Sequence, residues 1–295
     1  MKTQLNMFGL NIVDNLKRNV LIVSETSVTN KDQTYLLKLN TSEQEVRLLR
    51  DCFPKINQRD FGVLQLPVAH RVGSLFNNKD WWVIMDYFKG ESINWDERNP
   101  ECIGGKNISL DYINVLTGIL ADLKSIDIGL FSGVLPSVES APWYTSLKNK
   151  LTKLISCQLF PPSYRQKAIN MIEFGLSGES KKDLILTNGD FQFRNFIKLT
   201  NGKIAVIDWT ENSYNTPNIE PLEFAAMYQW TLMWANIAWQ NAYIKKITNK
   251  FGISKDRLKF SLLIKSINQA HLWRGAPELA KIQVSHSIQA LEGQI

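Results

Sequence analysis

Residues 188–195 read NGDFQFRN, and residues 207–209 read IDW. In this stretch Asn195 stands five residues after Asp190, and Asp208 follows at the end of the next apolar run. Transfer of a γ-phosphoryl group needs a carboxylate that orients or deprotonates the attacking hydroxyl, and oxygen ligands that hold Mg²⁺ against the phosphates. Each residue alone also fits an ordinary polar loop or a turn. The combination favours phosphoryl transfer, with Asp190 as the catalytic carboxylate and Asn195 and Asp208 as magnesium ligands.

The segments around this motif predict a small island of strands. Three short apolar runs, at residues 184–186, 196–199 and 204–207, have the length and composition of strands. Between the last two, residues 200–203 read TNGK, which is a strong hairpin turn. We therefore expect a hairpin that carries Asp208 back toward the metal-binding side of Asn195.

The chain before this island begins with a different pattern. Strands are expected at residues 10–13, 20–24, 35–39, 68–72 and 81–87, because these runs are aliphatic or β-branched and end at turn-forming clusters. Between the third and fourth strands, Ser42 is a candidate helix cap, and Pro54 is expected to end that helix. The first lobe is therefore predicted to be a small antiparallel sheet with one helix.

Helices dominate after a polar, turn-rich segment at residues 89–107. Apolar residues recur at three- and four-residue spacing over 110–123, 143–157, 164–176, 220–247 and 256–273. We expect an α+β protein with a nucleotide-binding lobe at 1–88, a hinge or linker at 89–108, and a larger, mainly helical lobe at 109–295 for catalysis and substrate.

The composition limits the partners. Of 295 residues, 44% are hydrophobic and 21% are charged, as in a globular protein. Lys and Arg outnumber Asp and Glu by 34 to 28, and the net charge of +6 fits an anionic partner such as a nucleotide. The basic residues occur in scattered pairs rather than in one dense stripe, so we expect no nucleic-acid partner.

Cysteine usage and hydropathy favour the cytoplasm. The three cysteines lie too far apart for a CxxC site, and their odd number does not indicate a disulfide framework. The first residues lack the apolar core of a secretory signal. Residues 224–244 carry no charge and are long enough to cross a membrane, but four side-chain amides would then lie in hydrocarbon. We expect a helix buried in the second lobe and no membrane partner.

The motif resembles that of the aminoglycoside phosphotransferase and choline kinase branch of the protein-kinase-like enzymes, H-G-D-x-x-x-x-N followed by I-D-W. The similarity covers most of the chain. It implies a two-lobed kinase-like fold that binds ATP and Mg²⁺ between the lobes and phosphorylates a hydroxyl group of a small molecule.

The resemblance extends to the first lobe. Residues 35–39, YLLKL, are similar to the strand whose lysine holds the α- and β-phosphates, so Lys38 is implied in nucleotide binding. Its implied ion-pair partner is Glu45, and Glu43 is the competing choice. Residues 82–92 resemble the fifth strand and the hinge, which implies that the backbone of Asp86, Tyr87 and Phe88 meets adenine.

The sequence departs from the family pattern at two places. Asn188 stands where the family has His, although Asn also donates and accepts hydrogen bonds. Residues 14–19, DNLKRN, contain no glycine where the family covers the phosphates, although Asn19 matches an Asn found there. These departures leave an alternative: a nucleotide-binding pseudokinase with a regulatory or scaffolding role.

The acceptor stays open between an aminoglycoside, an amino alcohol, a sugar and a related metabolite. A polycationic antibiotic would call for a cluster of acids in the second lobe, and the positive net charge argues mildly against it. Candidates for such a cluster are Asp111, Glu211, Glu220 and Glu278. Near them, Pro217 and Glu223 resemble a family element in which an acid braces the catalytic loop from the start of a buried helix.

Overall fold

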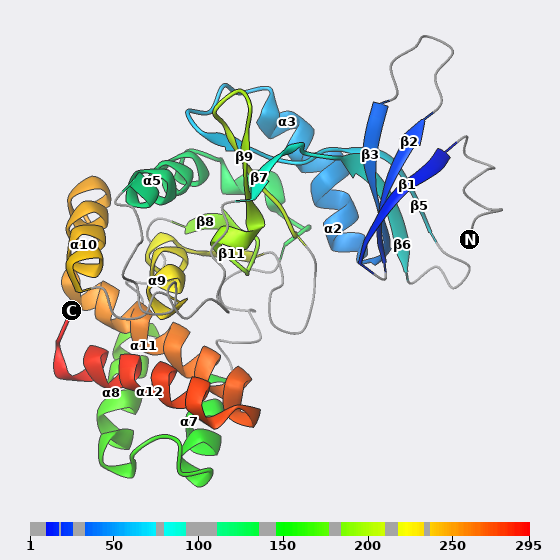
Figure 1. Cartoon of the computed structure of the whole chain (residues 1–295). Helices are drawn as coiled ribbons and strands as arrows, with labels where there is room; N and C mark the ends of the chain where they lie inside the picture. The colour runs from blue at the N-terminus through cyan, green and yellow to red at the C-terminus, as the bar shows by residue number, and fades with distance from the viewer. Residues whose placement is uncertain are drawn as a thin grey trace.

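The computed structural model describes residues 10–17, 19–25, 33–74, 80–92, 111–135, 146–176, 184–209, 218–232 and 237–295. In Figure 1 a twisted sheet forms one end of the molecule, and helices α7, α8, α11 and α12 form the other. The short strands β8, β9 and β11 lie between these two parts. The predicted α+β, two-lobed arrangement is confirmed.

The sheet of the first lobe has five antiparallel strands in the order β1-β2-β3-β6-β5. Their bounds are Leu10–Lys17, Val20–Glu25, Gln33–Thr41, Trp81–Asp86 and Ala69–Ser74 respectively. Leu21, Val23, Leu37 and Ile84 form a small apolar cluster on one face. Alternate residues of a strand point to opposite faces, so this face excludes water while the other receives a helix.

The helix of the first lobe is longer than expected. It begins with α2 (Glu43–Arg47), where the Ser42 hydroxyl accepts a hydrogen bond from the Glu45 N–H at 3.1 Å, and continues through a π-helical turn, η1 (Leu48–Cys52), into α3 (Phe53–Asn57). The expected end at Pro54 is wrong. Pro54 lies in the first turn of α3, where a proline needs no intrahelical N–H bond, and the wider π turn precedes it.

A second sheet joins the two halves of the chain. Its order is β4-β10-β9-β7, with bounds Leu64–Gln65, Ile204–Val206, Phe196–Leu199 and Gly90–Ser92. β10 pairs antiparallel with β9, which confirms the predicted hairpin, and parallel with β4. β7 pairs antiparallel with β9. The hairpin that carries the motif is therefore held by β4, which precedes the predicted 89–108 linker, and by β7, which lies inside it.

A third, two-stranded sheet precedes the loop at residues 188–195. β8 (Leu184–Thr187) pairs antiparallel with β11 (Asn218–Pro221), a strand that the sequence did not predict. β11 contains only four residues and ends in a proline, so it carries almost no alternation to recognise. Its pairing fixes the end of β8, from which residues 188–195 depart.

The helices of the second lobe share one continuous core with α2, η1 and α3. Their bounds are α5 Asp111–Lys124, α7 Leu147–Ser156, α8 Arg165–Leu176, α9 Leu222–Leu232, α10 Ile237–Phe251, α11 Lys255–Leu272 and α12 Pro277–Glu292. α11 is buried on most of its surface, since α7, α8, α9 and α12 all contact it.

Two helix expectations need correction. Residues 220–247, predicted as one helix, contain the end of β11 and then two helices, α9 and α10, with residues 233–236 outside the described chain. α12 was not predicted at all, because polar side chains such as Gln283 and Ser287 lie on its buried side. Within the described residues, no helix has both the length and the apolar character needed to span a bilayer.

Candidate functional site

The loop after β8 holds Asp190 and Asn195 against each other. The Asn195 side-chain amide nitrogen Nδ2 donates to the Asp190 carbonyl oxygen at 2.8 Å and to its carboxylate Oδ2 at 2.9 Å. Both residues are buried, at 3% and 5% exposure. A 3₁₀ turn, η6 (Phe193–Asn195), brings the Asn back onto the Asp, so the five-residue spacing closes a compact loop.

Asn188 fastens this loop to the neighbouring strand. Its Nδ2 donates to the Ile207 carbonyl oxygen at 2.9 Å, and its Oδ1 accepts from the Asp190 N–H at 3.2 Å. The Ile207 N–H in turn donates to the Asn195 carbonyl oxygen at 2.9 Å. Gly189 has φ 72°, in the left-handed region that glycine adopts without strain. Asn188 thus uses both its donor and its acceptor to couple the two halves of the motif.

Buried aromatic side chains pack together within the loop and against α5. The ring centroids of Phe191 and Phe196 are 4.9 Å apart. The centroid of the Phe193 ring lies 6.0 Å from that of Phe196 and 5.1 Å from that of Tyr112 on α5. The three phenylalanines are buried. Burial of such a side chain contributes roughly 1.5–3 kcal/mol, so the apolar positions of NGDFQFRN anchor its polar positions.

Asp208 follows β10 in an unusual backbone conformation. Its φ is 61°, and its side chain is 39% exposed. The next residue, Trp209, is buried: its indole N–H donates to the Val206 carbonyl oxygen at 2.8 Å, and its ring meets Phe53 at 4.9 Å. Asp tolerates the left-handed region better than most residues, but strain of this kind is concentrated at functional sites. Fixed neighbours thus hold the Asp208 carboxylate in an open position.

Lys38 and Glu45 form the ion pair that the resemblance implies. Lys38 Nζ lies 2.8 Å and 3.1 Å from the two carboxylate oxygens of Glu45, which is 1% exposed and also accepts a hydrogen bond from the Thr41 hydroxyl. Glu43, the competing choice, is exposed in the first turn of α2. Lys38 Nζ is also 3.7 Å from Asp208 Oδ1. The first-lobe pair and the motif of the second lobe therefore meet.

The other implied nucleotide contacts lie at the strand ends of the same sheet or just beyond them. Asp86 ends β6, where its carboxylate accepts from the Val68 N–H at 2.9 Å and lies 2.7 Å from His70 Nε2. Tyr87 and Phe88 follow between β6 and β7, partly exposed. Asn19 lies in the turn between β1 and β2, beside Val20, which pairs with Lys38 across β2 and β3.

Two site residues, Tyr228 and Lys265, were not found from the sequence. The Tyr228 hydroxyl of α9 donates to Asp190 Oδ1 at 2.7 Å. Behind it, Lys265 of α11 lies 5.5 Å from the centroid of the Tyr228 ring and 2.7 Å from Glu220 Oε2. Tyr228 stands in the charge-free run that we assigned to a core helix, and nothing in that run distinguishes it from a packing residue. Glu223, the acid expected to brace the loop, forms an ion pair with Arg257.

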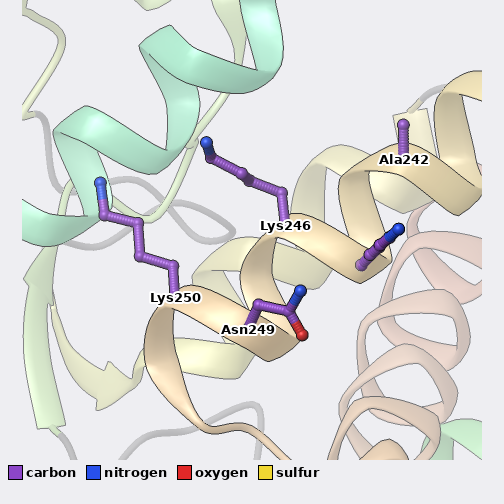
Figure 2. A pocket seen from close by; sticks show the side chains of 5 residues that line it. Ala242, Lys246, Asn249 and Lys250 are labelled. Atoms are coloured by element: carbon purple, nitrogen blue, oxygen red, sulfur yellow. The ribbon is translucent and has the colours of Figure 1, made fainter.

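A pocket on α10 differs in character from this site. Ala242, Lys245, Lys246, Asn249 and Lys250 line an open hollow of about 560 Å³, and Figure 2 shows Lys246 and Lys250 extending toward the same neighbouring helix. Lys250 Nζ donates to the Thr117 carbonyl oxygen of α5 at 3.0 Å. Tyr243 of the same helix is buried, and its hydroxyl donates to the Ala226 carbonyl oxygen of α9. The residues that line the pocket all belong to α10, and its three ammonium groups would repel a cationic ligand.

Comparison with known proteins shows the fold. No protein-family model matches the sequence, and no curated protein matches it. Among solved structures, the chain is similar to a thermostable mutant of the aminoglycoside phosphotransferase APH(4)-Ia in a ternary complex with ADP and hygromycin B. The TM-score is 0.61 and the identity 13%, over 99% of this chain and 97% of that one.

Two further structures extend the comparison. The GDP and kanamycin complex of APH(2″)-IIIa gives a TM-score of 0.56 at 11% identity, covering 99% of this chain and 97% of that one. A candidate fructosamine-3-kinase from Haemophilus somnus gives 0.53 at 11% identity, covering 97% and 96%. The chain thus has the kinase-like fold of these proteins over almost its whole length.

Proposed function

We propose that this chain transfers the γ-phosphoryl group of ATP to a hydroxyl group of a small molecule, with Mg²⁺ held by Asn195 and Asp208. The observation that carries the proposal is the 3.7 Å approach of Lys38 to Asp208. It joins a cation suited to phosphates to a motif whose two segments carry a candidate base and oxygen ligands, the three parts that phosphoryl transfer requires.

Each residue then has a defined role. Lys38, oriented by Glu45, binds the α- and β-phosphate oxygens. Asp190 orients the acceptor hydroxyl and accepts its proton. The hydroxyl oxygen forms a bond to the γ-phosphorus while the bond from that phosphorus to the bridging oxygen breaks, and ADP leaves with that electron pair. The short contacts of Asn188 and Asn195 hold the base in one position relative to Asp208.

The residues present fit magnesium. Asn195 uses its amide nitrogen on Asp190, so its carbonyl oxygen Oδ1 is the atom suited to a cation, and Asp208 supplies a carboxylate. Among the described residues, no cluster of three or more His, Cys, Asp or Glu side chains is arranged to hold a metal. Magnesium ordinarily takes one or two protein ligands, together with phosphate and water oxygens. When bound, the ion neutralises charge on the phosphates.

We assign the nucleotide base to the segment after β6. The Asp86 N–H already donates to the Val68 carbonyl oxygen at 3.1 Å, and its carboxylate is engaged by Val68 and His70. The Asp86 carbonyl and the backbone of Tyr87 and Phe88 are therefore the groups we propose for adenine, with Asn19 near the phosphates. Solved structures with this fold bind ADP or GDP, so both nucleoside triphosphates belong in the test.

Two of the four candidate acids already have cationic partners, which weakens the case for a polycationic acceptor. Glu220 is buried and pairs with Lys265 at 2.7 Å, and Glu278 pairs with Lys281 at 2.8 Å on α12. Glu211 lies outside the described residues. We therefore favour a neutral or singly charged alcohol, such as a sugar or an amino alcohol.

Isotope transfer tests the proposal. The protein is incubated with γ-labelled ATP or GTP, Mg²⁺ and a panel of aminoglycosides, amino alcohols, sugars and macrolides, with Asp190→Asn as the negative control. We expect labelled product from at least one class and none from the variant. Tight, magnesium-dependent nucleotide binding without product from any acceptor would favour the pseudokinase instead.

A further inference from the structure

The Asp190 carboxylate is held from two sides. Asn195, on the same loop, donates to Oδ2 at 2.9 Å, and Tyr228, on α9, donates to Oδ1 at 2.7 Å. Two donors on different oxygens fix the plane of the carboxylate as well as its position. A carboxylate has about four lone-pair sites, so each oxygen can still accept from a substrate hydroxyl.

A buried ion pair lies behind the tyrosine. Lys265 and Glu220, at 8% and 3% exposure, are 2.7 Å apart, and Lys265 Nζ is 5.5 Å from the Tyr228 ring centroid and 6.0 Å from that of Phe224. An ammonium group over a phenol ring is attracted to its face and draws electron density from it. This arrangement strengthens the hydroxyl as a hydrogen-bond donor.

Both members of the pair stand on elements that already support the loop. Glu220 lies on β11, opposite Ile185 of β8, whose last residue precedes Asn188. Lys265 lies on α11, which packs against α9. A buried ion pair is weak evidence for stability, because apolar residues of similar volume often replace one without loss. The position of this pair behind Tyr228 instead indicates a role in the site.

We propose that Tyr228 is a positioning residue for Asp190 and that the Lys265–Glu220 pair orients and strengthens its hydroxyl. The proposal rests on the proposed function, since it assumes that Asp190 receives the acceptor proton. Tyr228 does not touch the reacting atoms. Its hydrogen bond holds the carboxylate in the rotamer from which proton transfer occurs, so its loss lowers turnover rather than substrate binding.

The test compares two buried tyrosines that each lose one hydroxyl. Tyr228→Phe removes the bond to Asp190, whereas the control, Tyr243→Phe, removes a 2.9 Å bond to the Ala226 carbonyl oxygen. Loss of a hydrogen bond to a charged group lowers a rate constant by a factor of roughly 10 to 100 when the bond is needed for that step. We therefore expect the kcat of Tyr228→Phe to fall by that factor, while the KM values for nucleotide and acceptor stay within about twofold. Tyr243→Phe should keep kcat within about twofold. Unchanged kcat in Tyr228→Phe, or an equal fall in Tyr243→Phe, would overturn the proposal.

A second variant tests the ion pair and decides the case if Tyr228→Phe does not fold. Glu220→Gln with Lys265→Met removes both charges together and leaves no unpaired buried ion. We expect kcat to fall about 3- to 10-fold with KM unchanged, because the tyrosine becomes a weaker donor. A changed KM with normal kcat would contradict a positioning role.

A crystal structure of Tyr228→Phe separates this inference from the proposed function. We expect the Asp190 carboxylate to rotate about its χ2 angle while the Asn195 contact to its backbone carbonyl persists. An unrotated carboxylate would overturn the inference even in a fully active wild-type protein. If the wild-type protein transfers phosphate neither to an acceptor nor to water, the proposed function is refuted. The crystal structure of Tyr228→Phe would still show whether Tyr228 holds the carboxylate.

Discussion

The ammonium nitrogen of Lys38 lies 3.7 Å from Oδ1 of Asp208, a contact between the first-lobe sheet and the end of β10. The contact places a fixed positive charge beside the proposed magnesium ligand, which is the arrangement that a nucleoside triphosphate requires.

Replacing Lys38 with Met should weaken nucleotide use. The change removes the charge and leaves Glu45 buried with only its contact to Thr41 among the bonds described above. We expect kcat/KM for ATP to fall roughly 10- to 100-fold, the worth of a charged hydrogen bond. The control is Lys203→Met, which removes an exposed pair with Asp60 at 3.0 Å and should change kcat/KM by less than twofold, about the effect of a surface pair. Equal effects of the two variants would argue against a phosphate-binding Lys38.

Replacing Asp208 with Asn should alter the magnesium requirement. The amide keeps the size of the side chain but removes the negative charge that attracts the ion. We expect the magnesium concentration for half-maximal rate, at saturating nucleotide, to rise at least about tenfold, as for the loss of a charge-assisted contact. Asp60→Asn, at an exposed position, serves as the control. An unchanged magnesium curve would remove Asp208 from the ligand set.

Replacing Asn188 with Ala should loosen the loop. Asn188 is 0% exposed, and the change breaks its hydrogen bonds to the Ile207 carbonyl oxygen and the Asp190 N–H. Buried groups left without partners cost about 1–3 kcal/mol, so the free energy of unfolding measured in urea should fall by that amount. Asn170→Ala, on the exposed side of α8, should change it by less than about 0.5 kcal/mol. Comparable losses in the two variants would show that Asn188 is not a structural tie.

His286 should make stability depend on pH. Burial disfavours the charged form of His286 and lowers its pKa from 6.5 to about 4. Between these values the unfolded chain binds a proton that the folded chain does not, so the free energy of unfolding falls as pH falls from 6.5 to 4. The contribution lost is roughly 3 kcal/mol. Urea unfolding across this range should show a shallower pH slope for His286→Gln, and equal slopes would contradict the assignment.

The local part of the site could be predicted from the sequence. The spacing of Asp190 and Asn195 and the TNGK turn are short-range signals, and the hairpin they predict is the one that β9 and β10 form. The choice of Glu45 over Glu43 followed from resemblance. Capping by Ser42 explains it, because this cap sets which face of α2 meets Lys38.

The remaining part depends on long-range packing. Tyr228 reaches Asp190 from a helix whose first turns are buried all round, so no polar periodicity marks it. In the sequence, Lys265 resembles a surface lysine. In the structure it is buried and contacts residues of α9 and β11. The helix α12 was also missed, because its buried side is lined partly by polar residues and an apolar pattern does not include them.

Asp190→Asn tests the central claim most directly. The substitution keeps the size of the side chain but removes the carboxylate that we propose as the group receiving the proton of the acceptor hydroxyl. We predict that phosphate transfer from ATP falls at least about 100-fold, the usual contribution of a positioned general base. Magnesium-dependent ATP binding, measured by calorimetry on the same protein, should stay within about twofold, well below the tenfold step that 1.4 kcal/mol represents. Turnover equal to that of the wild-type protein would contradict the assignment of Asp190 as the catalytic base.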